Sequence, residues 1–152
     1  MYKFRKSTIE EKQQAVSYGM SGDWIYESGK AGNEEYALFF GKVRTVFGEP
    51  DYISEDWENM YGYMITAEDC EDNNKLFFEI YHGSCGSSVA MPRSKDVDSN
   101  AYEKAKKQLV ELIESAEPVD YEWEGVYEDI PVNIKYIVRN GKVKVESEFP
   151  EF

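Results

Sequence analysis

The sequence predicts an α+β fold: one domain over residues 1–152, with an antiparallel sheet of about five strands and two to three helices packed mainly on one face. Three observations predict it. Apolar residues recur at helical spacing in 33–47 and 98–116, apolar and other residues alternate in 60–81, and Asn140-Gly141 joins two further alternating segments. Hairpin-joined strands with helices between them, in the order α-α-β-β-α-β-β-β, are typical of this class.

The first helix is predicted from a capping-box pattern. In Ser7-Thr8-Ile9-Glu10 a serine is followed three residues later by a glutamate, so a short helix should begin here and end before Gly19. The segment from Met20 to Gly32 is rich in glycine and serine, and we expect it to be a loop.

The clearest helix follows Asn33, which can cap it. Its stripe of apolar residues lies on one helical face. The stripe consists of Tyr36, Phe39, Phe40, Val43, Val46 and Phe47. Gly48 and Pro50 then end the helix, since glycine suits the position after a helix and proline prevents it from resuming.

A β-hairpin is predicted in the middle of the chain. Met60–Ala67 and Lys75–Tyr81 alternate as strands do, and the turn residues of Asp69–Asn74 separate them. The flanking segments, Asp51–Glu58 and His82–Asp98, are expected to be loops because the first is acidic and the second is rich in glycine and serine.

The last third of the chain should hold a helix and three strands. Asp98, Ser99 or Asn100 caps the helix, and Pro118 ends it. Three strands are expected to follow, at Val119–Tyr127, Val132–Arg139 and Lys142–Phe149. Asn140-Gly141 is the strongest short signal for a hairpin.

Composition excludes several classes of protein. The chain has 152 residues with 17 basic and 30 acidic side chains, a net charge of −13, and 15% aromatic residues. So many aromatic residues argue against a disordered acidic tail, and so acidic a surface argues against direct binding of nucleic acid. No secretory signal or membrane-spanning apolar run is present, so a cytoplasmic protein with no membrane partner is expected.

The excess charge is concentrated in one window. Residues 49–72 contain 9 acidic and no basic side chains. Like charges at this density repel one another, and a cationic partner would relieve that repulsion and be attracted to the site. The alternative is that the charge serves only solubility. The candidate partner-binding residues are Asp51, Glu55, Asp56, Trp57, Glu58, Tyr61, Glu68, Asp69, Glu71 and Asp72.

Other chemistry in the chain is weakly specified. His82 and Cys85 share one glycine-rich loop and could form a nucleophile and its base, as in a small hydrolase, but nothing specifies an orienting third group. With Cys70 they could supply three zinc ligands, yet only His82 and Cys85 are close in sequence. Two cysteines are too few for a disulfide framework, so a reduced pair is expected, with a single disulfide between Cys70 and Cys85 as the alternative. We expect no catalytic residue, no metal and no cofactor.

Three segments carry a resemblance to a known class of protein. They are Lys42–Pro50, Tyr61–Ile65 and Leu76–Gly83. Together they resemble the small acidic immunity proteins that bacteria encode beside polymorphic or contact-dependent toxins. The resemblance implies that the chain neutralises a cognate toxin by direct occlusion, and that the toxin domain is basic, as a nuclease would be. It implies no catalytic residues, because immunity proteins act by binding.

Three hypotheses about function therefore stand side by side. The first is an immunity protein that acts through the acidic, aromatic-bearing window. The second is a small hydrolase that uses the His82–Cys85 loop. The third is a regulatory or structural interaction protein, homo-oligomeric through an exposed edge strand such as Lys142–Phe149.

Overall fold

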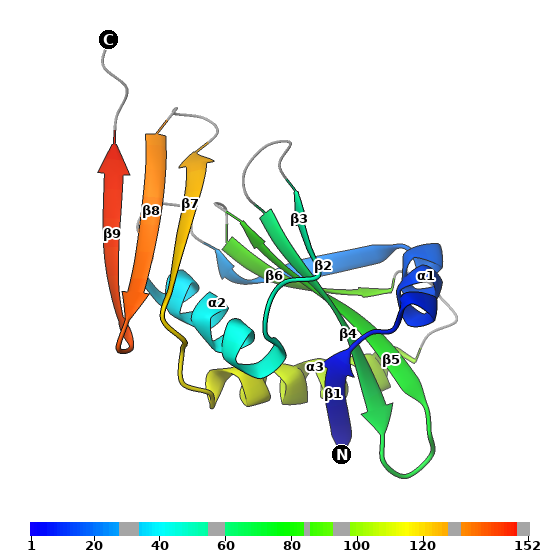
Figure 1. Ribbon diagram of the computed structural model, residues 1–152. Helices are drawn as coiled ribbons and strands as arrows, with labels where there is room; N and C mark the ends of the chain where they lie inside the picture. Colours follow the sequence, from blue (N-terminus) through cyan, green and yellow to red (C-terminus); the bar gives the residue numbers. More distant parts are fainter. Residues whose placement is uncertain (28–33, 55–59, 84–85, 93–97, 128–131, 149–152) are drawn as a thin grey trace.

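The computed structural model describes residues 1–27, 34–54, 60–83, 86–92, 98–127 and 132–148 (Figure 1). Within these ranges the chain forms two antiparallel sheets and three helices, which confirms the predicted α+β class.

The larger sheet has six strands, and the long β4 pairs with three of them, β1, β3 and β5. Its path runs β1-β4-β5-β6-β2, and β3 pairs with β4 on the same edge as β1. The shared edge is divided, because β3 pairs with residues 60–62 of β4 and β1 with residues 65–69. The strands are β1 (Tyr2–Lys6), β2 (Met20–Glu27), β3 (Tyr52–Ser54), β4 (Met60–Asp69), β5 (Lys75–Gly83) and β6 (Gly86–Pro92).

The smaller sheet is a three-stranded meander. Its strands are β7 (Tyr121–Tyr127), β8 (Val132–Arg139) and β9 (Lys142–Glu148), in that order across the sheet. Asn140 and Gly141 join β8 to β9 with φ angles of 53° and 74°. A two-residue hairpin turn of type I′ requires positive φ at both central residues, so the predicted hairpin is confirmed.

Helices lie on both faces of the larger sheet: α1 (Ile9–Tyr18) on one, and α2 (Glu34–Phe47) and α3 (Ser99–Glu114) on the other. Alternate residues of β4 separate the two sides. Tyr63 and Ile65 join the main core with α2 and α3, whereas Met64 packs near Ala15 of α1.

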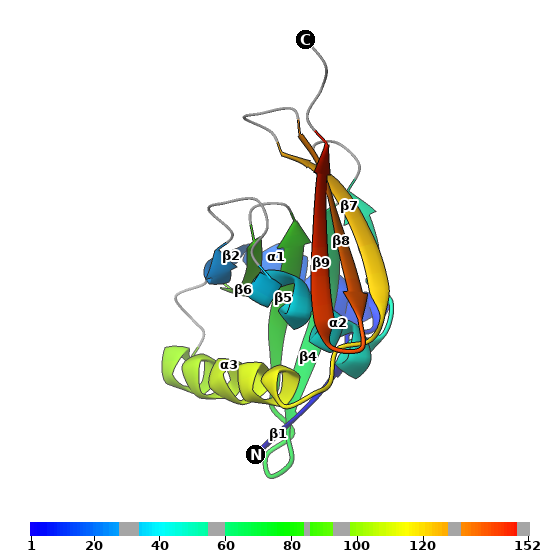
Figure 2. The ribbon, with the colours of Figure 1, turned by 90° about the vertical axis from the view of Figure 1, so that its left-hand side faces the viewer.

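Helix α2 lies between the two sheets, as Figure 2 shows from the side. Phe40 of α2 packs edge-to-face on Tyr63 of β4 and on Tyr121 of β7. Trp123 and Tyr136 of the smaller sheet belong to the same buried cluster. Both sheets therefore contribute to one core.

The strand count departs from the prediction. The described residues form nine strands, not about five, because β1, β2, β3 and β6 were not predicted and the last three of them lie in segments expected to be loops. In β6, Ser88, Val89 and Ala90 are buried between neighbouring strands, where small side chains fit. The glycine and serine content of this segment is typical of a loop, but its pairing with β5 and β2 makes it a strand.

The predicted capping box is one residue out of place. Thr8, not Ser7, caps α1: its side chain accepts from the Glu11 amide, and the Glu11 carboxylate accepts from the Thr8 amide. The Ser7 hydroxyl is buried and lies 2.7 Å from the hydroxyl of Thr66 on β4. The Ser7 side chain therefore contacts the larger sheet and does not cap α1. In α3 the cap is Asp98, one of the three residues predicted for it.

Candidate partner-binding surface

Strand β4 separates the acidic window into two groups. Ser54 and Met60, which flank residues 55–59, pair at one end of β4, and Asp69 lies at the other. Ten residues of strand span roughly 30 Å. Four of the candidates, Glu55, Asp56, Trp57 and Glu58, lie outside the described residues, and so does the side chain of Tyr61.

Asp51 stabilises the fold from inside the protein. Its side chain is only 10% exposed, and one oxygen lies 3.3 Å from Lys12 Nζ and 3.8 Å from Lys6 Nζ. The other oxygen accepts a hydrogen bond of 2.7 Å from the Met64 amide. Its charge is compensated, and Asp51 offers little to a partner.

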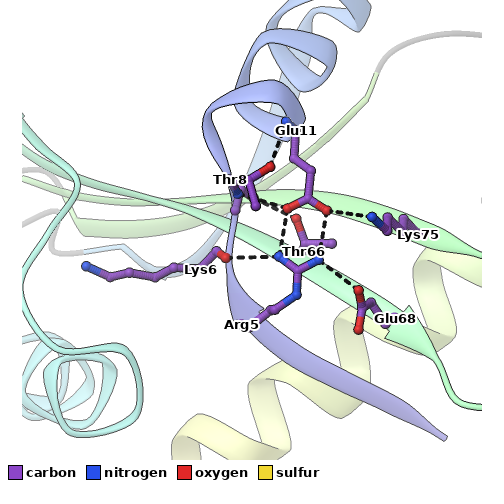
Figure 3. A network of polar contacts seen from close by, with 8 residues as sticks. Arg5, Lys6, Thr8, Glu11, Thr66, Glu68 and Lys75 are labelled. Carbon is purple, nitrogen blue, oxygen red and sulfur yellow. Dashed lines mark hydrogen bonds and ion pairs between the residues drawn. The ribbon is translucent and has the colours of Figure 1, made fainter.

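Glu68 is also paired internally, through a network that joins β1, α1, β4 and β5 (Figure 3). Arg5 Nη2 lies 2.8 Å from Glu68 Oε1, and the same guanidinium holds both oxygens of Glu11. Lys75 contacts Glu11 as well. The Arg5 hydrogen bonds, aided by the Thr8 amide and Lys75, hold the pKa of Glu11 well below its usual range although burial raises it.

The turn between β4 and β5 carries the acidic residues that remain available. Glu71 and Asp72 are exposed, and neither forms an ion pair with a described residue. Asp69 Oδ1 accepts from the Glu71 amide, and Asp72 accepts from the amide and side chain of Asn74. These bonds hold the turn in one conformation, so its carboxylates are presented by an ordered backbone.

Two residues that the sequence analysis did not select lie beside this turn. Tyr2 of β1 stands opposite Asp69 in the sheet. Burial raises the pKa of Tyr2, and the nearby carboxylates of Asp69, Asp72 and Asp98 raise it further. Asp98 comes from the N-cap of α3, where it accepts from the Asn100 and Ala101 amides.

We name this region the acidic end. Its members come from β1 and the β4–β5 turn, which lie side by side near the N-terminus in Figure 1, and from the N-cap of α3, whose Asp98 acts electrostatically on Tyr2. They are Tyr2, Asp69, Glu71, Asp72 and Asp98. The arrangement can attract a cation electrostatically, and Tyr2 can supply a partly apolar contact with a polar tip.

A shallow cleft of about 450 Å³ adjoins the same turn. It is lined by Lys3, Glu68, Asp69, Cys70, Asn73 and Lys75. Its charges are mixed, and Lys75 is already paired with Glu11. Cys70 is an exposed free thiol. No group of three acidic, histidine or cysteine side chains among the described residues is arranged to hold a metal.

The proposed nucleophile pair falls outside this description. Cys85 lies outside the described residues, and His82 belongs to β5 without a described side chain. Within the described part of the chain, no helix has the length and apolar character needed to cross a membrane. Comparisons with protein-family models, with curated proteins and with solved structures find no match.

Proposed function

We propose that the protein binds and neutralises a cognate bacterial toxin domain of basic charge, and that the acidic end is part of the contact surface. The observation that carries this proposal is the pair Glu71 and Asp72, whose exposed carboxylates no described lysine or arginine compensates. Asp51 and Glu68, by contrast, are paired within the protein. Part of the acidic window serves the fold, and the exposed carboxylates of Glu71 and Asp72 are available to a partner.

The electrostatics favour an interaction with a basic protein. A net charge of −13 repels other acidic molecules, and uncompensated carboxylates at one end draw a basic partner to that end. A nuclease toxin needs a basic groove for phosphate groups, so an acidic protein that occupies the groove would exclude the substrate. A standard interface of about 1,600 Å² is within reach of a domain of this size.

Co-purification tests the proposal directly. The probe is the C-terminal domain of a large secreted protein encoded next to the gene for this chain, co-expressed with the tagged protein. We expect the two to purify together and the cells to survive expression of the toxin domain. A toxin domain that neither binds nor is neutralised, or the absence of any such neighbouring gene, overturns the proposal.

A matched pair of variants tests the surface. Glu71→Lys with Asp72→Lys reverses the acidic end, and Glu10→Lys with Glu111→Lys changes the net charge by the same amount at exposed positions on α1 and α3. The first variant should lose protection and the second should keep it. Equal protection by both would remove the acidic end from the contact surface.

A further inference from the structure

Within the described part of the chain, the outer edge of the smaller sheet has no neighbouring strand. β9 is the terminal strand of that sheet, and no described element lies beyond it in either view (Figures 1 and 2). Among the described residues, no backbone hydrogen bond outside the sheet involves β9. An edge of this kind presents unpaired amide and carbonyl groups along its length, and it can pair with another strand.

The two faces of β9 differ. Val143 and Val145 pack partly buried against the main core, whereas Lys142, Lys144 and Glu146 are exposed. Among the side chains that the structure describes, the exposed face carries two lysines followed by a glutamate. Charge along this face is therefore segregated, with the positive half first.

This order of charges is complementary to itself when the strand is reversed. In an antiparallel pair centred on Val145, Lys144 stands opposite Glu146 of the second copy. This contact occurs twice, because a two-fold axis relates the strands. In this arrangement the buried face of β9 in one copy continues the buried face of β9 in the other, since opposed residues lie on the same side of a sheet.

Other registers place like charges together. A slip of two residues sets Lys144 opposite Lys144 or Glu146 opposite Glu146, and parallel in-register pairing opposes every lysine to a lysine. Charged side chains usually protect an edge strand against association. Among the described side chains, the antiparallel register centred on Val145 brings no like charges together, whereas the register centred on Lys144 adds a Lys144–Lys144 repulsion to two Lys142–Glu146 attractions.

We propose that two copies of the chain associate through β9 in this antiparallel register, which joins the two smaller sheets into one six-stranded sheet. The partner is a second copy, because the complementarity lies within one strand of this chain. The pairing goes beyond the proposed toxin binding. It leaves the acidic end accessible, because β1 and the β4–β5 turn lie away from β9 (Figure 1).

The interaction within one copy does not prevent this pairing. Lys144 Nζ lies 3.1 Å from Glu146 Oε1 on the same strand, but the two side chains are 72% and 47% exposed. Exposed pairs of this kind contribute little and exchange readily. Both side chains can therefore turn toward a second copy.

Sedimentation of charge-reversed variants tests the register. The wild-type protein should show a concentration-dependent monomer–dimer equilibrium. Lys144→Glu or Glu146→Lys each turns two attractive contacts into repulsive ones, so each should weaken the dimer about tenfold or more. Lys107→Glu and Glu111→Lys, at exposed positions of α3, make the same charge changes and should leave the equilibrium unchanged.

Mixing the two weakened variants gives the decisive result. Lys144→Glu carries two glutamates where Glu146→Lys carries two lysines, so the antiparallel register predicts that an equal mixture associates more strongly than either alone. Circular dichroism checks that each variant is folded. A wild-type protein that stays monomeric at every concentration, a dimer indifferent to the single substitutions, or a mixture no stronger than its components would overturn the proposal.

Discussion

Arg5 of β1 and Glu11 of α1 form a two-pronged ion pair, with 2.7 Å between Nη1 and Oε1 and 2.8 Å between Nη2 and Oε2. The pair joins the first strand of the larger sheet to the helix that follows it (Figure 3). Glu11 is only 6% exposed, so its charge needs this partner. The same carboxylate accepts from the Thr8 amide, which couples the ion pair to the start of the helix.

Replacing Arg5 should destabilise the protein. Arg5→Met keeps much of the side-chain volume but leaves the Glu11 carboxylate with only Lys75 and the Thr8 amide. We expect the free energy of unfolding to fall by about 2 kcal/mol, less than for a fully buried pair because Arg5 is partly exposed. Urea denaturation measures this loss of stability. The control is Lys3→Met, because Lys3 is an exposed residue on the same strand. Equal effects of the two substitutions would contradict this role for the pair.

Acid should weaken the protein through Glu11. The pKa of Glu11 is lowered on folding, chiefly by Arg5, so the ionised form contributes stability that is complete above its ordinary pKa of 4.5. That contribution is lost as the pH falls below 4.5 toward the lower folded value. We therefore expect the stability difference between wild type and Glu11→Gln to be constant near neutral pH and to shrink in acid. A stability difference that stays constant through the acid range would contradict a lowered pKa of Glu11 in the folded protein.

Gly41 of α2 should not tolerate even one added carbon. A Cβ at this position would lie 2.8 Å from the Cβ of Pro118 and 3.2 Å from Cε1 of Tyr121. Helix propensity alone predicts that Gly41→Ala stabilises the helix by about 1 kcal/mol. We expect a net loss of about 1–3 kcal/mol, because the helix must move from the chain that enters β7. Denaturation with an unchanged m-value measures it, and a gain in stability would contradict this packing.

The helices could be predicted because their signals are local. In α2 the residues Phe39, Phe40, Val43 and Phe47 were expected on one face, and all four are buried. In α3 four residues at helical spacing, Tyr102, Ala105, Leu109 and Ile113, are buried, but Leu112 is 40% exposed. The spacing of apolar residues predicts which face of a helix is buried, but the elements packed against the helix determine how much of that face is covered.

The missed strands depend on partners far away in the sequence. β2 and β6 pair with each other, and their glycine and serine content gives no alternating apolar pattern. β1 could have been predicted, because the apolar residues Tyr2 and Phe4 alternate with Lys3 and Arg5 as in a half-buried strand.

The candidate surface was predictable only in part. Glu71 and Asp72 were selected from charge density, and the turn presents them as exposed side chains. Asp51 looks identical in sequence, yet Lys6 and Lys12 approach it from outside the acidic window. Tyr2 and Asp98 could not be associated with the turn, because their proximity depends on the pairing of β1 with β4 and on where α3 begins.

The rate of association with the toxin domain, measured by stopped flow over a range of salt concentrations, tests the central proposal most directly. Electrostatic attraction to the acidic end predicts a fast rate that falls as salt rises, and Glu71→Lys with Asp72→Lys should slow it and flatten its dependence on salt. Glu10→Lys with Glu111→Lys should retain most of the wild-type rate. If all three proteins associate at the same rate with the same dependence on salt, the acidic end is not the surface that binds.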